Sequence, residues 1–121
     1  KSEYFREING FSEKYFLFWE EIDLCKKFLN KKYTVIVNPL SKAYHKEGSS
    51  SKTDFENLFI RSYHHEISPL YYFEVKKSSL RLYKNMLKYL FRTISYFFIL
   101  NFKNSVKNFS KLSANIAYIL K

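Results

Sequence analysis

Residues that break helices are scarce in this sequence, which has only two glycines and two prolines among 121 residues. This shortage excludes a fold built from many tight turns and favours long helices. A single cysteine, Cys25, excludes an internal disulfide and a zinc site made of cysteines, and it indicates a reduced, intracellular chain. No signal peptide opens the sequence, and the first residue is lysine rather than methionine, so a portion of a longer protein is expected.

Acidic residues are absent from the carboxy-terminal part of the chain. Residues 1–75 hold 11 basic and 11 acidic residues, whereas residues 76–121 hold ten Lys and Arg and no Asp or Glu. A tail of this kind suits an anionic membrane surface, nucleic acid or an acidic partner. Long apolar runs are also lacking, because the run at residues 94–100 is far shorter than the roughly 18–20 residues that cross a bilayer.

Aromatic residues, by contrast, are abundant, with 13 Phe and 11 Tyr. A turn is expected at Asn9-Gly10. Apolar residues then recur at helical spacing over residues 19–31, which predicts a helix. The β-branched segment 33–37 predicts a short buried strand, and residues 42–45 predict a second strand.

A further helix is expected to begin at Thr53, whose hydroxyl would cap it, with Glu56 three residues later in a capping-box pattern. Pro69 is expected to interrupt this helix. Helical periodicity resumes from about Leu70 and continues through the tail.

In a helix from Leu80, large apolar residues share one broad face: Tyr83, Leu87, Leu90, Phe91, Ile94 and Phe98. Basic residues share another face: Arg81, Lys84, Lys88 and Arg92. An aromatic-rich face beside a basic face suits a membrane interface. Packing of a helix pair on the preceding part of the chain and binding of nucleic acid are the alternatives.

The most informative segment runs from Gly10 to Cys25 and reads Gly-Phe-Ser-Glu-Lys-Tyr-Phe-Leu-Phe-Trp-Glu-Glu-Ile-Asp-Leu-Cys. On spacing alone, its acids at positions 20, 21 and 23 lie in the first turn of a helix, where they suit the helix dipole. The segment resembles the stretch G-F-D-E-x-F-F-x-Y-x-E-D-x-D-L-C of family 2 glycosyltransferases, especially the rhamnosyltransferase-like enzymes. The residues downstream are similar too, with a predicted strand, a proline, a histidine at position 45 and a serine-rich loop at residues 48–51.

This resemblance implies the α/β fold class. The chain would be a carboxy-terminal fragment of a GT-A fold, that of nucleotide-diphospho-sugar transferases, mostly helical with a few short strands. Residues 1–75 would be the carboxy-terminal part of the catalytic domain, and residues 76–121 a basic amphipathic helical tail. The Asp-x-Asp metal motif and the strand–helix repeats of the nucleotide-binding half are not in the sequence. The chain alone is therefore expected neither to bind donor nor to turn over.

The resemblance also implies roles for the acidic segment. Glu21 matches the general base that takes the proton of the acceptor hydroxyl, a position at which the family usually has Asp. Glu20 is the alternative base, because the longer side chain of Glu21 shifts its carboxylate. Asp23 and Trp19 are expected to contact the acceptor or to support the site locally.

The expected diphosphate end of the site lies further along the chain. His45 matches a histidine that in some relatives reaches the metal or the diphosphate, and Ser49, Ser50 and Lys52 are expected to bind the diphosphate. The complete enzyme would use a divalent cation, Mg²⁺ or Mn²⁺, to stabilise the departing diphosphate. Since base and diphosphate must flank one sugar carbon, the side chains of Glu21 and His45 are expected within roughly 10 Å of each other.

The expected function is that of an inverting glycosyltransferase of bacterial surface polysaccharide synthesis, such as lipopolysaccharide or capsule. It would move a sugar from a nucleotide-sugar donor to a saccharide or lipid-linked acceptor. Its expected location is cytoplasmic and peripheral, on the inner face of the cell membrane, with no nucleic acid as partner. The alternatives are a non-catalytic basic fragment that binds membrane or nucleic acid, and a remnant of a broken transferase gene. A nucleic-acid module would carry basic residues throughout, whereas the first 75 residues are neutral.

Overall fold

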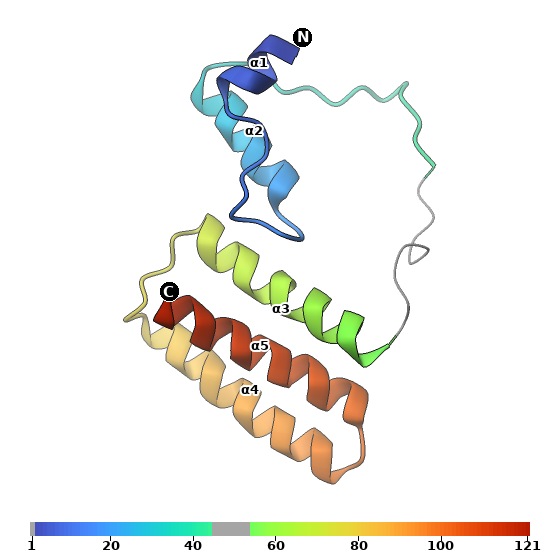
Figure 1. The fold of residues 1–121 in the computed structure, drawn as a ribbon, viewed down its shortest axis with the longest axis vertical. Coiled ribbons are helices and arrows are strands. Elements are labelled where there is room, and N and C mark those ends of the chain that lie inside the picture. The colour runs from blue at the N-terminus through green and yellow to red at the C-terminus, as the bar shows by residue number, and fades with distance from the viewer. Residues whose placement is uncertain (1, 45–53) are drawn as a thin grey trace. The chain divides into compact units, whose positions relative to one another are not determined.

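The computed structural model describes residues 2–44 and 54–121 of the chain. They belong to two compact units, Lys1–Lys52 and Thr53–Lys121. Helices α1 (Ser2–Glu7) and α2 (Glu20–Asn30) form the first unit (Figure 1). The second unit consists of α3 (Phe55–Tyr72), α4 (Leu80–Phe98) and α5 (Phe102–Leu120). These bounds confirm the predicted helix at residues 19–31 to within a residue, and the helical tail from Leu80.

The expected α/β class is wrong, because the described residues contain five helices and no strand. The β-branched segment at residues 33–37 has no regular structure, and Ile36 and Val37 are 79% and 90% exposed. A strand needs a neighbouring strand to pair its backbone N–H and C=O groups, and the described residues offer none. Residues 42–44 also lack regular structure, while position 45 of the second predicted strand lies outside the described residues.

A left-handed turn joins α1 to the rest of the first unit. Asn9 and Gly10 have φ angles of 56° and 58°, which confirms the turn predicted there. Glycine is needed at position 10, since a Cβ atom would lie 2.9 Å from the ring of Phe5. The carbonyl of Gly10 accepts a hydrogen bond of 3.0 Å from the Lys27 ammonium. This bond fastens the turn to α2.

Tyr33 fastens the other end of α2 to α1. Its backbone N–H donates to the carbonyl of Phe28 at 3.0 Å, and its hydroxyl donates to Glu7 Oε2 at 2.6 Å. Glu7 Oε1 also lies 3.4 Å from the Lys31 ammonium. The Tyr33 hydroxyl, followed by Lys31, holds the pKa of Glu7 below its usual value. The residues after α2 thus close the first unit through side chains rather than through strand pairing.

Helix α3 differs from expectation at both ends. Its amino-terminal cap is Asp54, whose carboxylate accepts a 2.8 Å hydrogen bond from the backbone N–H of Asn57, whereas Thr53, the predicted cap, lies outside the described residues. Pro69 lies inside the helix and does not interrupt it. Proline inside a helix costs about 3 kcal/mol through its missing N–H. Burial of Ile67 and Ser68 just before it supplies packing that keeps the last turn helical.

The second unit is a three-helix arrangement with α5 between α3 and α4 (Figure 1). Its core is small: Ile67, Leu82, Ala114 and Tyr118. Small buried side chains allow the helices to approach closely, and two of them form hydrogen bonds between helices. Ser110 Oγ donates to the carbonyl of Phe59 on α3 at 2.6 Å, and Ser105 Oγ donates to that of Thr93 on α4 at 3.0 Å. Helix α3 packs against α5, and Thr53–Lys121 forms one compact unit. The domain assignment at residue 75 stays a prediction.

A polar cluster crosses all three helices of this unit. The Tyr89 hydroxyl of α4 donates to Glu66 Oε2 of α3 at 3.0 Å, and Asn115 Nδ2 of α5 donates to Glu66 Oε1 at 3.2 Å. Burial first, and then the charge and hydrogen bond of Glu66, raise the pKa of Tyr89 well above its usual value. The cluster therefore stabilises the unit while Tyr89 keeps its proton.

We expect Tyr89→Phe to lower the free energy of unfolding by about 1–3 kcal/mol at neutral pH, because Glu66 loses one of its two donors. The loss should shrink at alkaline pH. Because the pKa of Tyr89 is higher in the folded than in the unfolded chain, its stabilising contribution is complete below the unfolded pKa of about 10. This contribution is lost as the pH rises through the folded pKa. The melting temperature of the native chain should therefore fall more steeply above about pH 10 than that of Tyr89→Phe.

Tyr83→Phe is the matched control for this experiment, since Tyr83 is an exposed tyrosine of the same helix. It should keep both the neutral-pH stability and the alkaline profile of the native chain. Identical alkaline melting curves for the native chain and Tyr89→Phe would show that the Tyr89–Glu66 bond does not contribute as described.

Candidate active site

The acids of the motif segment open helix α2. Glu20, Glu21 and Asp23 all lie in its first turn, and the carbonyl of Trp19 accepts the first helical hydrogen bond, from Asp23 N–H at 2.9 Å. No side chain caps this end, since Trp19 makes no capping hydrogen bond. The amino terminus of a helix carries partial positive charge, so it stabilises nearby carboxylates. The start of a helix therefore favours three acidic residues in one turn.

The three carboxylates have different surroundings. Oδ2 of Asp23 is buried and forms an ion pair of 3.5 Å with Lys27, whose ammonium also bonds Gly10. Oε2 of Glu20 is buried, and no described residue donates a hydrogen bond to it. Glu21 is exposed. Of the three residues, Glu21 is the exposed one, so its carboxylate is the most open to a solvent-borne hydroxyl group.

The backbone just before these acids is strained. Phe18 and Trp19 have φ angles of 63° and 72°, so two successive residues with large side chains adopt the left-handed conformation. Such residues cost about 1–3 kcal/mol each and cluster at functional sites. This left-handed pair leads directly into α2, which begins at Glu20.

The structure brings together only part of the predicted site. Trp19, Glu20, Glu21 and Asp23 share one turn because they are neighbours in sequence. His45 and the expected diphosphate-binding residues Ser49, Ser50 and Lys52 lie outside the described residues. The expected 10 Å approach of Glu21 and His45 lies outside them as well. Within residues 2–44 and 54–121, no group of three His, Cys, Asp or Glu side chains could hold a metal ion.

Two pockets lie away from the acidic residues of the motif segment. In the first unit, a pocket of about 400 Å³ lies at the opposite end of α2 and is lined by Glu7, Ile8, Asn9, Lys27, Asn30 and Lys31. In the second unit, a pocket of about 610 Å³ brings Glu66, Arg81 and Asn85 together with apolar side chains of α3 and α4. Sequence reasoning missed both, because each joins residues that are distant in the chain.

The tail carries a second candidate surface. Most large apolar residues of α4 are exposed rather than packed in the bundle. None of the helices in the described parts of the chain combines the length and the hydropathy that a bilayer-spanning helix requires.

The chain was also compared with known proteins. No protein-family model, no curated protein sequence and no solved structure matches it.

Proposed function

We propose that these residues supply the catalytic base of an inverting glycosyltransferase, which transfers a sugar from a nucleotide-sugar donor to a saccharide or lipid-linked acceptor. One observation carries the proposal. Glu21, which matches the base position of the motif segment, is an exposed carboxylate in the first turn of α2. This helix begins directly after two strained residues, Phe18 and Trp19. An acceptor hydroxyl can approach such a carboxylate, whereas the neighbouring acids have buried oxygens.

The chemistry assigned to Glu21 is general base catalysis. Its carboxylate takes the proton of the acceptor hydroxyl while the hydroxyl oxygen forms a bond to the anomeric carbon of the donor. The bond from that carbon to the diphosphate oxygen breaks, and its electron pair leaves with the nucleoside diphosphate. Attack from the face opposite the leaving group inverts the configuration at this carbon. One carboxylate suffices for such a single displacement.

The surroundings of the acids favour Glu21 over Glu20 as the base. A base must come within about 2.6–3.2 Å of the hydroxyl that it deprotonates. Oε2 of Glu20 is buried, and Asp23 is engaged by Lys27. We assign Asp23 to holding the first turn of α2, and Trp19 to shaping the entry of the chain into it.

The divalent cation that such a transfer uses would neutralise the departing diphosphate. The described residues do not fit a metal site, since no three potential ligands converge among them. Donor and metal binding are assigned to a nucleotide-binding portion outside the 121 residues, which themselves contain no Asp-x-Asp.

We place the enzyme on the cytoplasmic face of the membrane, as a peripheral protein of surface polysaccharide synthesis. The support is the exposed apolar and basic surface of the tail. A lipid-linked acceptor would be held at the same interface, so the tail would bring Glu21 to its substrate.

Transfer with inversion tests this proposal. The enzyme that carries this chain is incubated with nucleotide-sugars and a lipid-linked saccharide, and the anomeric configuration of the product is read by NMR. We expect a new glycosidic bond with the configuration opposite to that of the donor. Retention of configuration would contradict a single base at Glu21, because it requires two displacements.

A further inference from the structure

Helix α4 has an apolar face that does not pack within the three-helix unit. Leu82 and Tyr89 face the other helices and are buried. A separate apolar stripe along the same helix is exposed, and it consists of Leu80, Tyr83, Leu87, Leu90, Phe91 and Ile94. These residues recur at spacings of three and four, so they lie above one another along the helix. Exposed apolar patches of this kind mark interaction sites.

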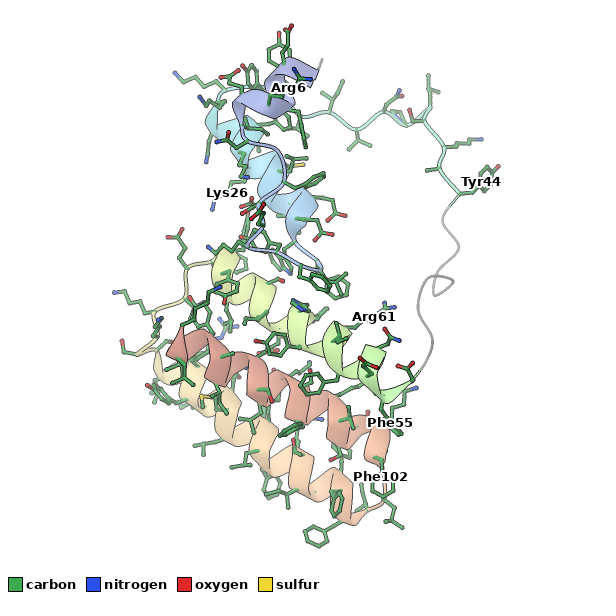
Figure 2. The ribbon with its side chains drawn as sticks, viewed as in Figure 1. Arg6, Lys26, Tyr44, Phe55, Arg61 and Phe102 are labelled. Atoms are coloured by element: carbon green, nitrogen blue, oxygen red, sulfur yellow. The ribbon has the colours of Figure 1, made fainter. Side chains whose placement is uncertain are left out.

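The stripe ends in an apolar tip at the turn between α4 and α5. Phe97, Phe98, Ile99 and Leu100 are 56%, 77%, 67% and 74% exposed. Contacts at the start of α5 stabilise the conformation of the tip. The rings of Phe97 and Phe102 contact at 5.8 Å, and Asn101 caps α5 by accepting a hydrogen bond from Asn104 N–H at 3.2 Å. Phe102 begins α5 beside this turn (Figure 2).

Basic side chains flank the stripe along α4. Arg81, Lys84, Lys88 and Arg92 are exposed and form a row along α4. No Asp or Glu occurs after Glu74. A target that meets this side of the unit must therefore accept large apolar side chains and offer negative charge beside them.

We propose that the apolar stripe and the apolar tip dock on an anionic lipid surface. Helix α4 lies along the interface, the tip enters between the lipid headgroups, and the basic row contacts lipid phosphates. An amphipathic helix with aromatic and basic residues binds such surfaces through buried apolar area together with charge. Nucleic acid fits less well, because phosphates would meet leucine and phenylalanine. This inference deepens the peripheral location proposed above, but it does not depend on sugar transfer.

Binding of the 121-residue chain to vesicles tests the inference. The vesicles contain phosphatidylcholine with phosphatidylglycerol, or phosphatidylcholine alone, and bound protein is measured by flotation. We expect clear preference for the anionic vesicles and weaker binding at high salt. The double variant Leu87→Glu, Leu100→Glu should bind anionic vesicles at least about tenfold more weakly, since each leucine otherwise leaves water.

The matched control changes two exposed leucines of the first unit, as Leu29→Glu with Leu40→Glu. It alters net charge equally and should bind nearly as well as the native chain. Circular dichroism checks that both variants stay helical. Equal loss of binding in both double variants, or equal binding to both kinds of vesicle at low salt, would overturn the proposal.

Two further outcomes would also overturn it. The stripe would be an interface between copies of the chain if sedimentation showed that the native chain is a dimer and the Leu87→Glu, Leu100→Glu variant is not. In that case neither protein would bind vesicles. It would be a nucleic-acid surface if duplex DNA bound and vesicles did not. Neither donor nor acceptor enters this assay, so its outcome does not depend on sugar transfer. Vesicle binding together with an absence of transfer by the complete enzyme would refute only the proposed activity.

Discussion

Replacing Glu21 by glutamine should lower the kcat of sugar transfer by about 10²–10⁴-fold, the contribution of a positioned general base. The amide keeps the shape of the side chain but cannot take the acceptor proton. Glu21 is exposed, and no contact of its side chain holds α2 in place within the described residues, so stability should change little. The KM for the donor should also stay nearly unchanged. Initial rates with saturating donor and acceptor measure the effect.

Two controls separate base chemistry from helix stability. Glu56 occupies the same place in α3 as Glu21 does in α2, as the second residue of the helix, and it is exposed as well. Glu56→Gln should therefore leave kcat unchanged while removing a similar interaction with the helix dipole. Glu20→Gln should lower kcat less than Glu21→Gln. A greater loss of kcat in Glu20→Gln would identify Glu20, rather than Glu21, as the base.

Replacing Leu82 by alanine should have the largest effect on stability, about 2–5 kcal/mol of the free energy of unfolding of the second unit. Leu82 is 1% exposed and lies in the buried cluster with Ile67, Ala114 and Tyr118. Small domains are stable by only about 5–15 kcal/mol, so this loss would remove a large share of the stability of the unit. Urea titration followed by circular dichroism measures it.

The same substitution at Leu87 is the control, because Leu87 lies on the same helix but is 68% exposed. Leu87→Ala should change stability by no more than about 0.5 kcal/mol. If the two alanine variants unfolded at the same urea concentration, Leu82 would not be part of the core described here.

The helices could be predicted from sequence where periodicity is strong and uninterrupted. Residues 20–30 and the tail from Leu80 satisfy this condition, and both predictions are confirmed. The strand at residues 33–37 was predicted from its β-branched residues, but a strand also requires a neighbour, and local composition cannot supply one. Pro69 predicts a break because its local cost is visible in sequence, whereas the packing of Ile67 that outweighs this cost is not.

The candidate site could also be predicted only in part from the sequence. The sequence places the acids of α2 in one helical turn, because they are neighbours. It gives no sign that Glu21 is exposed while an oxygen of Glu20 is buried, or that Phe18 and Trp19 adopt left-handed conformations. The cluster of Glu66, Tyr89 and Asn115 was also missed, since its members are 23 and 49 residues apart. Such contacts exist only once the helices pack.

The most direct test of the assigned base compares Glu21→Asp with Glu21→Gln in single-turnover transfer, with the same donor and acceptor. Aspartate keeps the carboxylate and shortens the side chain by one methylene, whereas glutamine keeps the length and removes the base. We predict that Glu21→Asp transfers sugar at least about tenfold faster than Glu21→Gln, because misplacement of a base costs less than its loss. Transfer by Glu21→Gln at the native rate would contradict the assignment of Glu21 as the catalytic base.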